Sequence, residues 1–193
     1  MKGLIRIAGI CGILAPVIAI SSVFLSIFFE KNFSWTGNAL SDLGVSEGIS
    51  SPIFNLGLMI SGILFFVYGI GLFNFFEGII PKLGTLILLM TSIALSSIGV
   101  FTENAEPFHY YASATFFLLF PISTFIFAIY FYLTRRLKLA LLSFFTFVVV
   151  VIAVAWIVAM KVGIAIPETL ASVSMFVLPL VLGYELATSK SIQ

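Results

Sequence analysis

Six apolar stretches, each long enough to cross a lipid bilayer, restrict what this chain can fold into. A transmembrane helix needs about 20 mainly apolar residues, and 61% of the 193 residues are hydrophobic while only 9% are charged. Six such helices use nearly all of the apolar residues, so no room remains for a separate soluble domain. The sequence therefore predicts an all-α, polytopic transmembrane bundle of six helices that forms a single domain over residues 1–193.

The expected helices are separated by short segments that contain most of the charged residues. The first helix begins with Lys2 and Arg6, as a signal peptide would, but its apolar run of about 26 residues exceeds the roughly 7–15 of a signal peptide. We therefore expect this segment to be retained as a span. The six expected spans cover about residues 4–29, 51–76, 82–101, 107–133, 137–160 and 166–187.

The basic residues predict the orientation of the bundle, because Lys and Arg accumulate in cytoplasmic loops. With six spans, both termini and the loops after the second and fourth spans lie on one side, which carries seven basic residues against two on the other. This asymmetry predicts a multi-pass protein of the cell membrane whose N- and C-termini are cytoplasmic. The seven are Lys2, Arg6, Lys82, Arg135, Arg136, Lys138 and Lys190, and the two are Lys31 and Lys161.

The acidic residues show the opposite distribution, although acidic residues do little to set topology. Six of the eight fall on the expected outer side. Two explanations stay open, since these carboxylates either solvate short external loops or belong to a polar site. The six are Glu30, Asp42, Glu47, Glu103, Glu106 and Glu168.

Polar pairs mark the starts of the second, fourth and sixth spans, each of which opens with a proline. The members of a pair are four residues apart, so they share one helical face. If these faces point inward, they form a polar funnel that opens to the outside. The prolines indicate either ordinary helix starts or three related helical hairpins. The pairs are Ser51 with Asn55, His109 with Ser113, and Glu168 with Ser172.

The first external loop is expected to cap this funnel. Its segment 36–44, TGNALSDLG, can form a short helix that Thr36 caps at the start and Gly44 ends. Its leucines would then face the membrane, and Asp42 would turn toward the funnel. A plain connecting loop is the alternative. The polar face of the helix would carry Asn38, Ser41 and Asp42.

Asp42, Glu103 and His109 are the best candidates for chemistry, because a carboxylate beside a histidine can bind a divalent cation or act as an acid–base pair. The chain has one histidine and one cysteine, so a three-histidine zinc site is impossible and no cysteine-based metal motif exists. A histidine at a helix start more often has a structural role, and the sequence leaves any cofactor unknown. Any metal site would consist of Asp42, Glu103 and His109. The candidate ligand-binding residues are Ser41, Asp42, Asn55, Glu103, His109, Ser113 and Glu168.

Three segments resemble a known family, namely NALSDLG at residues 38–44, PIFNLG at 52–57, and GVFTE at 99–103 followed by His109. That family comprises prokaryotic six-helix integral membrane proteins and is catalogued as a domain of unknown function. The resemblance implies six spans and draws attention to Ser41, Asp42, Asn55 and His109. A fainter similarity connects the chain with membrane hydrolases of the ceramidase and progestin-receptor type, from which it differs by lacking two of their three metal-binding histidines.

These features favour a non-catalytic membrane protein, either an accessory subunit or a binder of lipid or another small ligand, with a polar pocket open to the outer face. Its expected partners are the lipid bilayer and lipid headgroups or other membrane subunits. A net charge of +1 argues against nucleic acid as a partner. Two alternatives stay open: a membrane-embedded lipid-modifying hydrolase that uses the Asp/Glu/His cluster, and a small-solute transporter.

Overall fold

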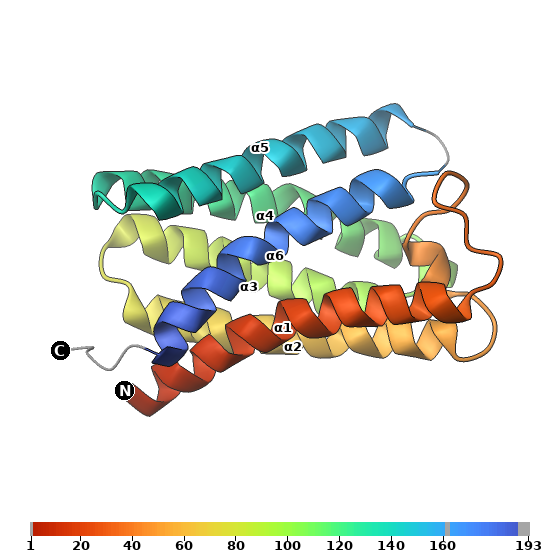
Figure 1. The fold of residues 1–193 in the computed structure, drawn as a ribbon, viewed down its shortest axis with the longest axis horizontal. Coiled ribbons are helices and arrows are strands. Elements are labelled where there is room, and N and C mark those ends of the chain that lie inside the picture. Colours follow the sequence, from red (N-terminus) through yellow and green to blue (C-terminus); the bar gives the residue numbers. More distant parts are fainter. Residues whose placement is uncertain (1, 161–162, 189–193) are drawn as a thin grey trace.

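The computed structural model describes residues 2–160 and 163–188 and arranges them as six long α-helices (Figure 1). All six are long and apolar enough to cross a membrane, which confirms an all-α, multi-pass membrane protein. Of the residues that predict orientation, Lys161 and Lys190 lie outside the described residues. The helices are α1 (Lys2–Phe29), α2 (Ser50–Phe75), α3 (Ile79–Val100), α4 (Phe108–Leu133), α5 (Leu137–Ala159) and α6 (Ala165–Thr188), with short 3-10 helices η1 (Ser41–Gly44) and η2 (Glu103–Ala105).

The observed helices match the expected spans, and the largest difference is at the start of α3. This helix begins at Ile79 instead of residue 82 and therefore has Pro81 in its first turn. Proline is tolerated there because its missing N–H would have no partner within the helix. The same rule applies to the even-numbered helices, where Pro52 and Pro167 lie in first turns and Pro107 immediately precedes α4.

The helices form a closed ring in which each helix packs against its neighbours in sequence and α1 also packs against α6 (Figure 1). Aromatic side chains occupy the centre of the ring. Phe65 is 2% exposed, and its ring centroid lies 5.7 Å from that of Phe176 and 6.4 Å from that of Phe120. Aromatic pairs at these separations stabilise a packed interior beyond the burial of their area, so this cluster helps to hold α2, α4 and α6 together.

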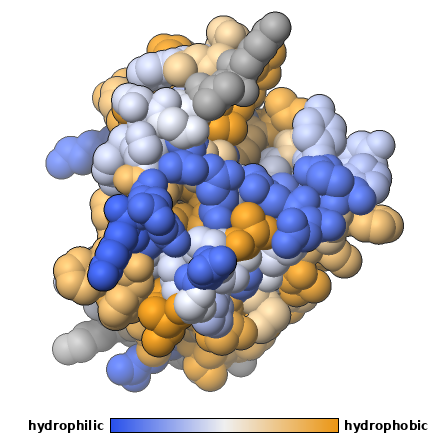
Figure 2. Space-filling model, turned by 90° about the vertical axis from the view of Figure 1, so that its right-hand side faces the viewer, coloured by the Kyte–Doolittle hydropathy of each residue, from blue (hydrophilic) through white to orange (hydrophobic). Residues whose placement is uncertain are grey.

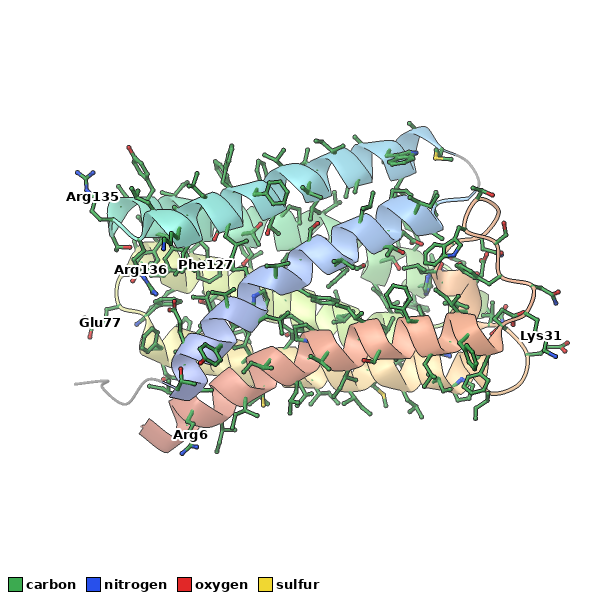
Figure 3. All side chains as sticks on the ribbon, viewed as in Figure 1. Arg6, Lys31, Glu77, Phe127, Arg135 and Arg136 are labelled. Carbon is green, nitrogen blue, oxygen red and sulfur yellow. The ribbon has the colours of Figure 1, made fainter. Side chains whose placement is uncertain are left out.

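The two ends of the bundle differ in their residues. We call the end where α1 begins and α6 ends the terminal end, and the end that carries η1 and η2 the loop end (Figure 1). Arg6, Arg135 and Arg136 lie at the terminal end, whereas Lys31 lies at the loop end (Figure 3). Hydrophilic residues form a band across the loop end, and hydrophobic residues surround it (Figure 2).

Helices α1 and α6 cross closely near the terminal end and diverge toward the loop end (Figure 1). The crossing requires glycine, because a Cβ added at Gly9 would lie 2.5 Å from the Ala187 nitrogen and 2.7 Å from the Gly183 oxygen. A Cβ at Gly183 would lie 2.8 Å from the Gly9 oxygen. Small residues therefore allow the two backbones to approach at one end only, and this sets the angle at which the helices separate.

Candidate functional site

Residues 36–44, which we call the lid, lie across the loop end of the bundle (Figure 1). The predicted helix over these residues is wrong, because only the 3-10 helix η1 from Ser41 to Gly44 forms and Thr36 does not cap it. In an α-helix that starts at Thr36, the Leu40 N–H would bond to the Thr36 carbonyl. Here it donates to the Glu168 carboxylate at 2.7 Å instead. A contact with α6 thus overrides the local helical pattern.

The lid turns its leucines into the bundle, whereas the sequence predicted that they would face the membrane. Leu40 is 7% exposed and Leu43 is 0% exposed, and both belong to the hydrophobic core. A second bond to α6 runs from the Ala165 N–H to the Asn38 carbonyl at 3.0 Å. The lid is therefore attached to α6 by apolar burial and by two hydrogen bonds.

Ser41 attaches the lid to η2, because its hydroxyl donates to the Glu103 carboxylate at 2.6 Å. Glu103 is half-buried there, and burial raises its pKa above the ordinary value. The Ser41 hydrogen bond and the nearby His109 act to lower the pKa, while the negative charge of Asp42 raises it further. Glu103 and Asp42 are therefore electrostatic neighbours at the loop end.

Asp42 stabilises the lid from within. Its Oδ2 accepts a hydrogen bond from Asn38 Nδ2 at 2.6 Å and another from the Ala39 N–H at 3.0 Å. A carboxylate that accepts bonds from a backbone N–H and a side chain three and four residues earlier fixes the path of its loop. Asp42 thus shapes the lid and does not turn toward a funnel.

The polar pair of α2, Ser51 and Asn55, holds the end of the lid. Asn55 Nδ2 donates to the Gly44 carbonyl at 2.8 Å, and the Ser51 hydroxyl donates to the same oxygen at 2.7 Å. Among the described residues, Asn55 Oδ1 is the buried side-chain polar atom that lacks a hydrogen-bond partner. A Cβ at Gly44 would lie 2.7 Å from this oxygen, so a larger residue there would displace the Asn55 side chain.

His109 joins the start of α4 to the end of α3. Its Nδ1 lies 2.7 Å from the Phe101 carbonyl oxygen, to which it donates, and its Nε2 lies 3.4 Å from the Ser113 hydroxyl. The ring is 7% exposed. Within residues 2–160 and 163–188, no three His, Cys, Asp or Glu side chains are grouped so that they could hold a metal ion. His109 Nδ1 is therefore engaged by the end of α3, and the described residues do not bring Asp42, Glu103 and His109 together as a three-ligand cluster.

A cavity of about 70 Å³ lies beneath the lid, between α1, α2, α3, α4 and α6. Its polar residues lie toward the lid, since Glu168 and Ser172 on α6 are followed by Phe176 one turn deeper. Ser113 and Phe117 repeat this order along α4. Of the predicted site residues, Ser41, Ser113 and Glu168 line the cavity, whereas Asp42, Asn55, Glu103 and His109 support the lid and the helix ends.

The cavity reaches the side of the bundle between α1 and α6. Phe24 of α1 is 47% exposed and Val173 of α6 is 42% exposed, and both line the cavity. Both residues belong to helices that are long and apolar enough to cross a membrane, and we call the opening between them the mouth of the cavity. The lid residues Leu40 and Ser41 also line the cavity, which places the lid where the predicted funnel would have opened to water.

Sequence reasoning did not identify the wall that α1 contributes. Ile20 and Val23 line the cavity, but they are apolar residues in an apolar span and carry no signal of their own. Thr169, which also lines the cavity, had a weak signal, because it directly follows Glu168 and lies four residues before Val173 on the same face.

Comparison with known protein families identifies the family of this chain. A family model described as "Protein of unknown function (DUF998)" matches residues 13–185. The chain belongs to this family. The DUF998 match extends from α1 into α6 and confirms the resemblance to six-helix membrane proteins of unknown function. No curated protein matches the chain, and no solved structure matches it. The fainter similarity to ceramidase-type and progestin-receptor-type hydrolases is supported by none of these comparisons.

Proposed function

We propose that this DUF998 protein is a non-catalytic membrane protein that binds part of a lipid-like amphiphile beneath its lid. The observation that carries the proposal is a cavity that is polar next to the lid, apolar at depth, and bordered by exposed apolar residues between α1 and α6. An amphiphile likewise has a polar group at one end and an apolar chain at the other. Its polar group would lie near Ser41, Glu168 and Ser172, and its chain would lie against the phenylalanines.

The size of the cavity limits the part of the ligand that enters it. One water molecule needs about 10–15 Å³, so about 70 Å³ holds only a few waters. Sites for drug-sized ligands occupy roughly 300–1,000 Å³. A whole two-chain lipid is therefore too large, whereas a head group or one chain segment fits while the rest of the molecule stays in the bilayer through the lateral mouth.

The orientation predicted from Lys and Arg would place the loop end at the outer face of the cell membrane. In that orientation the mouth between α1 and α6 opens to the outer leaflet. The protein would then take its ligand from that leaflet, and both termini would lie in the cytoplasm.

The hydrogen bonds around the lid favour binding over hydrolysis. A hydrolase would use His109 as its base. The Nδ1–H of His109 donates to the Phe101 carbonyl, and the residue does not line the cavity. The Asp42 carboxylate accepts bonds from its own loop. Neither His109 nor Asp42 lines the cavity that a substrate would occupy.

Native mass spectrometry of variants with a filled cavity tests the proposal. Ser172 lines the cavity, so Ser172→Phe places a large ring in it, whereas Ser174→Phe adds the same bulk to α6 outside the lining. We expect an amphiphile to copurify in mild detergent with the parent protein and with Ser174→Phe but not with Ser172→Phe. Equal adducts on all three proteins, or adducts on none, would contradict the proposal. Circular dichroism confirms that each variant is folded.

A further inference from the structure

We infer that the cavity selects amphiphiles with a cationic head group, of which a primary alkylammonium is the simplest. This inference rests on the proposed function, because it concerns the head group of the ligand bound beneath the lid. Two features carry it: a buried carboxylate in the cavity wall, and the absence of Lys and Arg from the described residues that line the cavity.

Glu168 presents acceptor capacity to the cavity. The residue is 8% exposed, lines the cavity, and accepts the Leu40 N–H with Oε2 at 2.7 Å. An ionised carboxylate has about four lone-pair positions on two oxygens, so one bond to the lid leaves it able to accept further bonds. Ser41 and Ser172 add hydroxyl groups to the same part of the cavity. A head group that carries several hydrogen-bond donors fits this arrangement.

The charges around the lid distinguish among such head groups. Asp42 and Glu103 lie close enough for their negative charges to act on Glu168. Lys31, the described basic residue of this end, is exposed and does not line the cavity. Buried charges in proteins are normally paired, and an ammonium group supplies both the opposite charge and three donors. A hydroxyl head would leave the Glu168 carboxylate without an opposite charge, and a phosphate or sulfate head would lie against Glu168 with Asp42 and Glu103 nearby.

Trp35 provides a signal for occupancy of the mouth. Its ring centroid lies 6.4 Å from that of Phe24, which lines the cavity. The chain contains two tryptophans, so the background Trp156→Phe leaves Trp35 as the single tryptophan, and Trp156 does not line the cavity. An amphiphile with a brominated chain quenches indole fluorescence on close approach and would therefore report its own binding.

The test compares brominated dodecylamine, dodecanol and dodecyl sulfate at equal mole fraction in phosphatidylcholine nanodiscs that hold the single-tryptophan protein. Ser172→Phe in the same background measures quenching by bilayer amphiphile that is not in the cavity. Glu168→Gln removes the charge but keeps an oxygen that can accept the Leu40 N–H. We expect the amine to bind roughly tenfold more tightly than the alcohol, the difference that one charge-assisted bond produces, and Glu168→Gln to remove this difference.

The outcomes separate the two proposals. If the alcohol and the amine quench equally and both exceed the Ser172→Phe background, the cavity binds amphiphiles without selecting the head group, and the inference is overturned while the proposed function stands. Stronger quenching by dodecyl sulfate overturns the inference in the same way. If no amphiphile exceeds the Ser172→Phe background, both the inference and the proposed function fail.

Discussion

The bond between Glu168 and the Leu40 N–H provides the most direct test of how the lid is held. At 2.7 Å, with the Glu168 residue 8% exposed and Leu40 7% exposed, this is a buried hydrogen bond to an ionisable acceptor. Glu168→Ala removes the acceptor and leaves a buried N–H without a partner. Hydrogen bonds to charged groups contribute about 1.5–3 kcal/mol, and a buried donor that loses its partner costs about 1–3 kcal/mol. We therefore expect Glu168→Ala to lower the free energy of unfolding by about 2 kcal/mol.

Glu168→Gln is the matched variant, because its amide oxygen can still accept the Leu40 N–H. The bond becomes weaker when the acceptor is neutral, but the cost of burying a charge near Asp42 and Glu103 disappears. These effects oppose each other, so we expect the free energy of unfolding to change by less than about 1 kcal/mol. Glu77→Ala, at an exposed position beyond α2, serves as the control for loss of a glutamate and should have no effect.

Two measurements together test whether the bond from Glu168 holds the lid. Unfolding by sodium dodecyl sulfate in mixed micelles, followed by far-UV circular dichroism, gives the free energies of unfolding. Hydrogen exchange followed by mass spectrometry reports the lid itself, where residues 38–41 should exchange faster in Glu168→Ala and at the parent rate in Glu168→Gln. The reasoning is refuted if lid exchange is unchanged in Glu168→Ala, or if Glu168→Gln destabilises the protein as much as Glu168→Ala does.

Two further predictions concern the helix crossing and the η2 carboxylate. Gly9→Ala should lower the free energy of unfolding by about 1–3 kcal/mol, because its Cβ would lie 2.5 Å from the Ala187 nitrogen. Gly3→Ala is the control and should be neutral or stabilising, because nothing lies within 4 Å of the new Cβ. Equal unfolding curves for the two variants in mixed micelles would contradict this prediction. Because folding raises the pKa of Glu103 above 4.5, its contribution to stability is full below that pH and is lost as the pH rises through the raised value. Glu103→Gln should therefore flatten the pH dependence of thermal unfolding in this range, by less than about 1 kcal/mol since the group is half-exposed, while Glu106→Gln should retain the slope of the parent.

The transmembrane helices were predictable because their signal is local. A run of about 20 apolar residues has few stable alternatives in a bilayer, and prolines mark the starts of α2 and α6 where they do not interrupt a hydrogen bond. The lid was not predictable in the same way. Its local pattern suits an α-helix, but the acceptor for the Leu40 N–H lies 128 residues away along the chain, in Glu168.

The candidate site was predicted only in part, because some of its residues give a local signal and others depend on contacts between distant parts of the chain. Spacing along single helices identified Ser113 and Glu168, both of which line the cavity. Ile20 and Val23 were missed because their position depends on the angle between α1 and α6. That angle depends on the contact of Gly9 with Gly183, and no pattern within one helix records which glycines meet.

The ring of helices is closed by its first and last members, and this has a consequence for how the protein is made. Each of the helices α2 to α5 can pack against the helix inserted before it, but α1 must keep its other side available until α6 enters the membrane. Residues of α6 also supply one wall of the cavity and the acceptor that positions Leu40. During synthesis, therefore, the nascent chain does not enclose this cavity until its final span arrives, and a lipid that occupies the gap beside α1 must leave before the ring of helices closes.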